Sequence, residues 1–408
     1  MKKESKKPSE AFDYEKFEKE AVKKLLSGKG LTGKDGVLTG LIGRLIAAAY
    51  DEEIKQHLTE AEESNRRNGY TSKTVKTSLG ALQINPPRDR NGSFEPQIIA
   101  KRHRSLAPEI EQQILSLYAR GSSYIDISRF VEETYGVQYS PSTLTAITDR
   151  IFDELRVWKS RPLEPMYAVI YLDAIHYKIR EDRQVQTRAV YTVYGVDLEG
   201  NRDVLDLVIG QAESSKQWAR ILESLKDRGV EDVLFFCVDG LNGFKEAIES
   251  SFPKSILQRC IVHLVRNSCK YISSKDRRAV CRDLKEIYTC DSAELGYEQL
   301  QVFKERWSNY EAVGELWERN WMELSPFFDY SSALRRMIYT TNAVEALHRI
   351  MRKVTKTKGA FVSAEALQKQ LYLAIKYSEK SWKRKARSWT EILIVLHREF
   401  EDRIVHYI

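Results

Sequence analysis

The stretch Tyr167-Ala-Val-Ile-Tyr-Leu-Asp173 decides the fold, because its unbroken apolar run suits a strand that is buried on both faces of a sheet. A second apolar run, Val233-Leu-Phe-Phe-Cys-Val238, has the same character and is followed directly by Asp239. The first run is followed in the same way by Asp173. We therefore expect two fully buried strands that both end in an acid.

The segments around these runs predict the rest of a sheet. Strands are expected at residues 187–196, 203–209 and 256–259, and an amphipathic helix at residues 214–228. The chain after residue 261 has a helical pattern throughout. The order of three strands, helix, strand, helix and strand predicts a mixed α/β sheet whose later strands run parallel to the first. This order is expected of a ribonuclease-H-like fold.

The two aspartates would lie side by side if their strands are parallel neighbours, because functional groups gather at the carboxyl ends of such strands. Two adjacent anions are costly unless cations neutralise them. Mg²⁺ prefers oxygen ligands, and two ions about 4 Å apart can activate a nucleophile and stabilise a leaving oxygen. The alternative is that either aspartate only opens a turn, as Asp239-Gly240 often would.

A third acid is expected from a helix packed on the same edge. Glu345, in Tyr339-Thr-Thr-Asn-Ala-Val-Glu345, is the best candidate. The structural alternative is a capping-box-like helix start, since Asn342 precedes Glu345 by three residues. The two roles are compatible, because the helix dipole favours an acid in the first turn in either case.

Basic residues gather in two stretches, although the net charge of +7 is modest. Residues 64–104 hold nine lysines and arginines against two acids, and residues 346–390 hold twelve against two. Such stretches can follow a polyanionic backbone, since neutralised phosphates release counterions. Each stretch alone could be a solvated helix face. Together, in a chain with these carboxylates, they favour a nucleic acid partner.

The N-terminal part is expected to be mainly helical, with helices at residues 15–26 and 37–58. Two short strands, at residues 75–79 and 81–84, and an arginine-rich turn at residues 86–92 follow.

Three helical segments are then expected between residues 107 and 155. The first two cover residues 108–119 and 124–135, and Ser140-Pro141 opens the third. A helix, a glycine turn and a helix form a helix-turn-helix, whose last helix can enter the major groove of DNA. Its groove-facing start would carry Ser142, Thr143 and Thr145. The alternative is a plain three-helix bundle.

The composition argues against a membrane or secreted protein. No apolar run approaches the length of a membrane span, and the charged residues 1–8 have no apolar core behind them. The five cysteines are odd in number and include no CxxC pair. A reduced, cytoplasmic setting fits best.

Six motifs carry a resemblance to a known family. They are Asn68-Gly-Tyr-Thr-Ser-Lys-Thr-Val-Lys-Thr77, Pro87-Arg-Asp-Arg-Asn-Gly-Ser-Phe-Glu-Pro96, Tyr171-Leu-Asp-Ala-Ile-His176, Cys237-Val-Asp-Gly-Leu-Asn-Gly-Phe244, Cys260-Ile-Val-His-Leu-Val-Arg-Asn267 and Ile338-Tyr-Thr-Thr-Asn-Ala-Val-Glu345. In order and spacing they resemble bacterial insertion-sequence transposases of the Mutator type, in the DDE transposase superfamily. The resemblance spans roughly residues 60 to 395.

The resemblance implies an Asp-Asp-Glu catalytic and metal-binding triad at Asp173, Asp239 and Glu345. It implies two Mg²⁺ ions, for which Mn²⁺ can substitute, and a helical insertion at about residues 273–332. One departure is Ala346-Leu347-His348, where many relatives read Ser-Leu-Asn. It follows the acid and puts no catalytic residue in doubt.

The family also carries a Cys-x-x-His element, here Cys260 and His263. Two ligands are too few for a structural zinc site. We therefore favour a helix start with a buried cysteine and with His263 near the active edge, and treat both as candidate neighbours of the site. Three tryptophans of the insertion could stack on an unpaired base, but core packing is favoured. They are Trp307, Trp317 and Trp321.

We therefore expect a cytoplasmic enzyme at the bacterial nucleoid that binds double-stranded DNA at terminal inverted repeats. It would cut an end phosphodiester and join the exposed 3′-hydroxyl to target DNA, as a homodimer or larger assembly.

Besides the three hydroxyl residues of the helix-turn-helix, the expected DNA contacts are Arg66, Arg67, Lys73, Lys76, Arg88, Arg90, Lys101, Arg102, Arg104, Lys353, Lys356 and Lys358. Two alternatives stay open: a non-enzymatic DNA-binding regulator, and another ribonuclease-H-like nuclease such as a junction resolvase.

The predicted division of the chain has five parts. They are a helical region (1–63), a basic strand-and-turn segment (64–105), a helix-turn-helix domain (106–160), a catalytic domain (165–395) and the end of a C-terminal helix (396–408).

Overall fold

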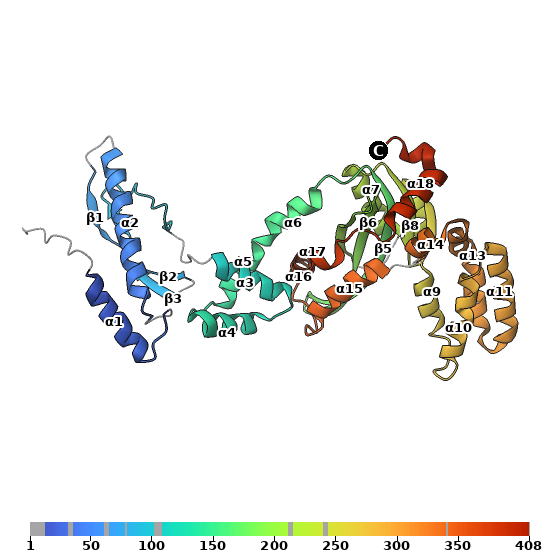
Figure 1. Ribbon diagram of the computed structural model, residues 1–408, viewed down its shortest axis with the longest axis horizontal. Coiled ribbons are helices and arrows are strands. Elements are labelled where there is room, and N and C mark those ends of the chain that lie inside the picture. The colour runs from blue at the N-terminus through green and yellow to red at the C-terminus, as the bar shows by residue number, and fades with distance from the viewer. Residues whose placement is uncertain are drawn as a thin grey trace, which may run out of the picture. The chain divides into compact units, whose positions relative to one another are not determined.

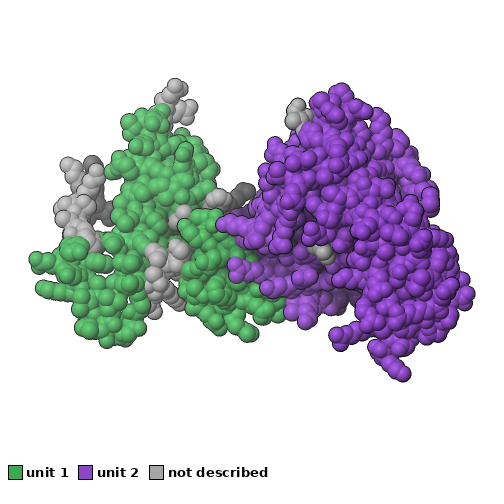
Figure 2. Space-filling view, turned by 45° about the vertical axis from the view of Figure 1, so that its right-hand side comes forward, with its two compact units in different colours: residues 1–118, 122–148 green, residues 119–121, 149–408 purple. Residues whose placement is uncertain are grey.

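The computed structural model describes residues 13–31, 36–60, 65–77, 80–101, 108–210, 215–239, 244–339 and 342–407. The chain forms two compact units (Figure 2). Unit 1 comprises residues 1–118 and 122–148, and unit 2 comprises residues 119–121 and 149–408. The five-part division stays a prediction.

Unit 1 begins with two helices and two small antiparallel ladders. The elements are α1 (Tyr14–Leu26), α2 (Thr39–Glu60), β1 (Arg67–Tyr70), β2 (Lys73–Thr77), β3 (Gly80–Ile84) and β4 (Pro87–Asp89). β2 pairs with β3, and β1 pairs with β4. Tyr50 of α2 packs on Val75 and Ile84 of the ladder, and its hydroxyl donates to the carbonyl of Ile99 at 3.1 Å. This contact ties α2 to the ladder.

The expected turn at residues 86–92 is wrong in part, because Pro87–Asp89 forms strand β4 and its partner β1 is not predicted. The cause is the buried carboxylate of Asp89. It accepts hydrogen bonds from Asn65 at 2.8 Å and from the amides of Ser93 and Phe94. These bonds hold the pKa of Asp89 well below its usual range, against the opposing effect of burial. Such long-range pairing leaves little trace in a short, proline-rich segment.

Three helices complete unit 1. They are α3 (Pro108–Ala119), α4 (Tyr124–Tyr135) and α5 (Pro141–Asp149). Ser123 and Asp126 form a capping box at the start of α4, which ends at Gly136 with a left-handed φ of 63°. The third predicted segment is in fact two helices, because α6 (Ile151–Ser160) begins after Arg150. The break lies where unit 1 passes into unit 2.

Unit 2 is built on a five-stranded mixed sheet, as predicted. The strands are β5 (Met166–Glu181), β6 (Gln184–Asp197), β7 (Arg202–Gly210), β8 (Asp232–Val238) and β9 (Ile256–Arg259). Their order in the sheet is β7-β6-β5-β8-β9. β5, β6 and β7 are antiparallel, whereas β8 runs parallel to β5 and β9 runs parallel to β8.

Helices cover both faces of this sheet (Figure 1). On one face, Trp218 and Leu222 of α7 (Ser215–Asp227) and Ile248 of α8 (Phe244–Ser251) pack on Ile170 and Phe236. The other face is covered by α9 (Ile261–Ser268), α15 (Asn342–Thr355), α16 (Ala364–Tyr377), α17 (Glu379–Trp382) and α18 (Trp389–Ile404) together with the insertion. Burial on both faces explains the unbroken apolar runs of β5 and β8.

The chain between β9 and α15 is helical in its described residues. After α9 come α10 (Arg277–Tyr288), α11 (Ala293–Arg306), η1 (Ser308–Tyr310), α12 (Glu311–Arg319), α13 (Trp321–Leu324), η2 (Ser325–Asp329) and α14 (Ser332–Ile338). In Figure 1, α10, α11 and α13 gather beside the sheet. The indole N–H of Trp317 donates to Ser268 Oγ at 3.0 Å, and that of Trp307 donates to Asp283 Oδ2 at 2.9 Å. The tryptophans of this region therefore pack within the protein.

One prediction about the sheet is wrong: Asp173 does not end its strand. β5 continues to Glu181, because Ile175, Tyr177 and Ile179 are buried and pair in a hairpin with β6. The parallel pairing with β8, however, stops at Leu172 and Val238. Asp173 is thus the first residue of β5 beyond β8, and Asp239 follows the last residue of β8.

Within the described residues, no helix is both long and apolar enough to cross a membrane. All five cysteines are free thiols.

We expect Gly200→Ala to lower the free energy of unfolding of unit 2 by about 2–5 kcal/mol. Gly200 has a φ of 82°, and an added Cβ would lie 2.4 Å from the Trp389 ring. The substitution therefore combines left-handed strain with a clash. Urea unfolding followed by tryptophan fluorescence measures unit 2 selectively, since all seven tryptophans lie there.

Gly229→Ala is the matched control, because Gly229 has a φ of 105° but its added Cβ would meet only the Leu163 carbonyl at 3.4 Å. It should cost about 1–2 kcal/mol, from backbone strain alone. Equal losses in the two variants would contradict the packing of Gly200 on Trp389.

Candidate active site

Asp173, Asp239 and Glu345 approach one another from three distant elements. Asp173 is 3% exposed on β5, and the pairing of Leu172 with Val238 puts Asp173 and Asp239 at matching positions of adjacent parallel strands. Glu345 lies in the first turn of α15. Burial, then the charge of Asp239 and, more weakly, that of Glu345, raise the pKa of Asp173 to about 8, although the Ala174 amide and Arg352 act the other way.

Three consecutive backbone carbonyls fix the end of α14, a few residues before α15 begins. The carbonyl of Met337 accepts a hydrogen bond from the Tyr171 hydroxyl at 2.8 Å. The carbonyl of Ile338 accepts one from the Cys237 thiol at 3.0 Å. The amide of Ile261 donates to the carbonyl of Tyr339 at 3.0 Å. The chain just before α15 is thus held by β5, β8 and α9, the elements that border the acids.

Glu345 contacts two residues of α9. Its Oε1 lies 2.7 Å from the Arg266 guanidinium and 3.8 Å from His263 Nε2. Burial and the charge of Arg266 lower the pKa of His263, so this ring is neutral near pH 7. His263 Nδ1 is buried without a hydrogen-bond partner. Cys260, one turn earlier, is buried at the start of α9.

His348, named above only as part of the departure from the family pattern, is a contact of the site. It is 2% exposed, with Nδ1 3.5 Å from Asp173 Oδ2 and Nε2 2.9 Å from Thr192 Oγ1. Burial, and then the charges of Arg352 and His263, lower the pKa of His348 to about 3. Its contact with Asp173 is therefore polar rather than ionic at neutral pH. The sequence does contain a signal for this contact: His348 lies three residues after Glu345, and residues three apart share a helix face.

The described residues contain no group of three acidic, histidine or cysteine side chains arranged to hold one metal ion. Glu345 is bound to Arg266 instead. The chemistry of the carboxylates nevertheless fits a hard cation, because Asp173 is buried beside other acids and contacts a neutral histidine.

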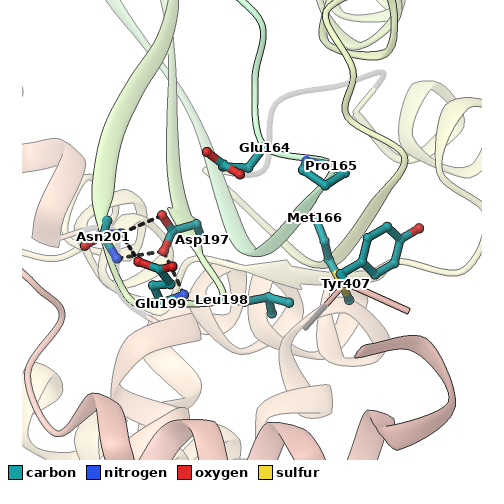
Figure 3. A pocket seen from close by; sticks show the side chains of 8 residues that line it. All are labelled: Glu164, Pro165, Met166, Asp197, Leu198, Glu199, Asn201 and Tyr407. Carbon is teal, nitrogen blue, oxygen red and sulfur yellow. Dashed lines mark hydrogen bonds between the residues drawn. The ribbon is translucent and has the colours of Figure 1, made fainter. Parts of the chain in front are cut away.

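Acids at the other end of β5 have a different role (Figure 3). A pocket of about 160 Å³ there is lined by Glu164, Asp197 and Glu199, among others. Asp197 Oδ1 accepts hydrogen bonds from the amides of Glu199 and Asn201, and its Oδ2 accepts one from the Asn201 side chain. These bonds hold the turn between β6 and β7, so Asp197 has a structural role there.

Residues 14–385 match the family model described as "Transposase, Mutator family". The chain belongs to this family. A transposase for insertion sequence element ISRM3 from Rhizobium meliloti is 40% identical over 384 residues, covering 92% of this chain and 96% of that protein. A probable insertion-element transposase from Corynebacterium diphtheriae is 37% identical over 291 residues, covering 71% of this chain and 84% of that protein.

A match to a chain of the solved Drosophila P element transposase strand transfer complex covers 73% of this chain and 87% of the matched chain. Its TM-score is 0.27 and its sequence identity is 10%, which are too low to inform the fold.

Some basic residues of unit 1 in this transposase already form ion pairs or hydrogen bonds within the protein, and others do not. Arg66, Arg88 and Arg90 are exposed and form no ion pair within the described part of the chain. Arg67 pairs with Asp51 at 2.9 Å. In the same unit, Lys73 donates to the Ala100 carbonyl at 3.0 Å and Lys101 pairs with Glu95 at 2.9 Å. The side chain of Lys76, and residues Arg102 and Arg104, lie outside the described residues.

The three predicted hydroxyl contacts lie at the start of α5. Ser142 is exposed, and its hydroxyl contacts that of Ser140 at 2.8 Å, as does the Thr143 hydroxyl. Thr145 donates to the Pro141 carbonyl at 3.0 Å. Ser142 is therefore the most accessible of the three.

The three predicted lysines after Glu345 also differ. Lys353 and Lys356 are exposed on and just beyond α15. Lys358 donates to Gln370 Oε1 at 2.5 Å and lies over the Phe361 ring. Burial lowers its pKa to about 8. Lys358 is thus held within the protein, whereas the other two are accessible to a ligand.

Asp173→Asn should make unit 2 of the transposase more resistant to unfolding at alkaline pH in the absence of divalent ions. The folded pKa of Asp173, about 8, exceeds its ordinary value of 3.8. Its stabilising contribution is therefore complete below about pH 3.8 and is lost as the pH rises towards 8. At about 1.4 kcal/mol per pH unit for one titrating group, the wild type should lose about 4–5 kcal/mol relative to the variant between about pH 4 and pH 8. Urea unfolding in EDTA tests this.

Asp227→Asn, at an exposed position of α7, is the control and should follow the wild type across this range. A constant difference between Asp173→Asn and wild type at all pH values would refute the raised pKa.

Proposed function

We propose that this chain cuts DNA at the ends of its insertion sequence and joins them to target DNA, using Asp173, Asp239 and Glu345. The observation that carries the proposal is the approach of three acids, far apart in the chain, at the point where β8 ceases to pair with β5. A buried acid with a raised pKa in such a cluster is typical of a functional site. Membership of the transposase family supports the assignment.

We infer that the sheet is ribonuclease-H-like. The supporting observation is its topology: an antiparallel hairpin pair, β5-β6-β7, extended on the other side of β5 by the parallel strands β8 and β9. In this arrangement the first and fourth strands are neighbours. The two aspartates lie directly after the last paired residues of these two strands, Leu172 and Val238.

Asp173 and Asp239 would hold Mg²⁺, or Mn²⁺ in its place, and Glu345 would complete a site for two ions. When bound, such ions stabilise charge on a phosphate as Lewis acids and lower the pKa of an attacking water. Glu345 would have to leave Arg266 to serve as a ligand. Arg266 would then be available to a DNA phosphate in the same site.

His348 would position Asp173. Thr192 and Asp173 contact opposite nitrogens of its ring, so the ring orientation is set from both sides. A polar neighbour that orients a metal-binding carboxylate commonly tunes metal affinity. His348 is therefore a positioning residue in this proposal, not a catalytic one.

Unit 1 would recognise the terminal inverted repeats. The exposed Arg66, Arg88 and Arg90 would contact phosphates, and Ser142 at the start of α5 would face the major groove. Joining requires that two DNA ends be held together. We therefore propose at least a homodimer as the active assembly.

Asp239→Asn should retain DNA binding but lose cutting and joining by about 10³-fold or more, because a neutral amide is a poor ligand for a hard cation. The assay is cleavage and strand transfer with Mg²⁺ on duplex DNA taken from the flanks of the gene. Asp227→Asn is the control and should keep both activities. Strand-transfer products from Asp239→Asn at the wild-type rate would rule out the acidic site.

His348→Ala should raise the Mg²⁺ concentration needed for half-maximal cleavage by about 10–100-fold, because Asp173 loses an orienting contact. His348→Asn should recover part of this loss, since its amide can still donate a hydrogen bond. A structural role alone would change the free energy of unfolding in EDTA but leave the Mg²⁺ requirement of the folded enzyme as it was. That result would remove His348 from the site.

A further inference from the structure

A second pocket of unit 2 has an unusual lining. Its volume is about 370 Å³, and three of its lining residues are arginines: Arg202 at the start of β7, Arg336 on α14 and Arg387 just before α18. The lining contains no aspartate or glutamate. Tyr171 and Ser388 add hydroxyl groups, and the other lining residues are alanines, a methionine and an isoleucine. The pocket thus combines concentrated positive charge with an apolar wall.

The charge of two of these arginines, Arg202 and Arg387, is poorly compensated within the described part of the chain, whereas Arg336 Nε donates to the Ser332 carbonyl at 3.3 Å. Arg202 Nε is buried without a hydrogen-bond partner. Neither Arg202 nor Arg387 forms an ion pair within the described part of the chain. Asp203, the nearest acid to Arg202 in sequence, is bound to Arg161 at 2.7 Å. A buried guanidinium N–H without a partner is costly, and three like charges around one pocket repel each other unless an anion joins them.

We propose that this pocket binds a phosphate group with its attached nucleoside. Guanidinium groups match phosphate oxygens with paired hydrogen bonds, and several arginines together favour phosphate over smaller, less charged anions. The volume exceeds the need of a bare phosphate and lies in the range of small-ligand sites. The apolar wall would face the sugar or base.

The pocket adjoins the elements that carry the acids. Its residue Tyr171 precedes Asp173 by two positions on the same face of β5, a spacing of about 6–7 Å along a strand. Its residue Ala343 precedes Glu345 by two positions on α15. A DNA strand cut at the acids could therefore place a neighbouring nucleotide here. This source of the phosphate rests on the proposed function.

The first arm of the test measures binding of the full chain to a labelled duplex from the flanks of the gene, by fluorescence anisotropy from about 50 to 200 mM salt. The logarithm of the binding constant falls with the logarithm of salt concentration, with a slope of about 0.7–0.9 per neutralised phosphate. In the double variant Arg202→Gln/Arg387→Gln the slope should be smaller by about 0.7–0.9, the contribution of one phosphate, because the two arginines would bind the same phosphate. Arg398→Gln is the control, since Arg398 is exposed on α18 and bound to Glu399.

The second arm titrates the free protein with deoxyadenosine monophosphate by calorimetry. A reduced salt slope without binding of the mononucleotide identifies the DNA backbone as the source of the phosphate. Binding of the mononucleotide that the double variant loses, with an unchanged slope, identifies a free nucleotide instead. An unchanged slope and no mononucleotide binding to wild type overturn the proposal.

Two further measurements keep the result interpretable. Because Arg387 is exposed, Arg387→Gln alone should leave the tryptophan-monitored unfolding curve unchanged. It should still reduce the salt-dependence slope of DNA binding, as the double variant does. If wild type binds no DNA at all, the proposed function fails. The mononucleotide titration still decides whether the pocket takes a phosphate.

Discussion

The hydrogen bonds that the carbonyls of Met337, Ile338 and Tyr339 accept are the constraint on which the site depends. Their donors come from β5, β8 and α9, so the end of α14, a few residues before α15, is tied to both strands that lead to aspartates. Each bond contributes only about 1 kcal/mol net, but a buried carbonyl left without its partner costs about 1–3 kcal/mol. The end of α14 is therefore fixed against the sheet, close in the chain to the helix that carries Glu345.

This constraint brings together charges that oppose folding. Asp173 is buried beside Asp239 and near Glu345, and its pKa rises accordingly. Arg266 offsets part of this repulsion at Glu345, whereas the neutral His348 gives Asp173 only a polar contact. The result is a cluster whose ionised form needs a cation, which is the property that a metal-dependent transposase of the Mutator family would use.

The arginine-lined pocket and the acids are complementary features of unit 2. One concentrates negative charge at the sheet edge, and the other concentrates positive charge two residues earlier along β5 and α15. Both include a buried ionisable group that is poorly matched within the protein: the carboxyl group of Asp173 in one and Nε of Arg202 in the other. Such local mismatches persist because the surrounding core, packed on both faces of the sheet, holds them in place.

The sequence alone was enough for the five strands of the sheet, their mixed direction and the helices around them, because β5 and β8 begin as apolar runs that only a doubly covered sheet can bury. It also singled out the three acids, with help from family motifs for Glu345. Tertiary structure decided that β5 continues past Asp173 and that β1 pairs with β4. It also decided that His348 contacts Asp173, that Arg266 contacts Glu345, and that three arginines distant from one another in sequence line one pocket. The reason is physical: hydrophobic periodicity is a local signal, whereas these contacts join side chains whose meeting depends on how whole elements pack.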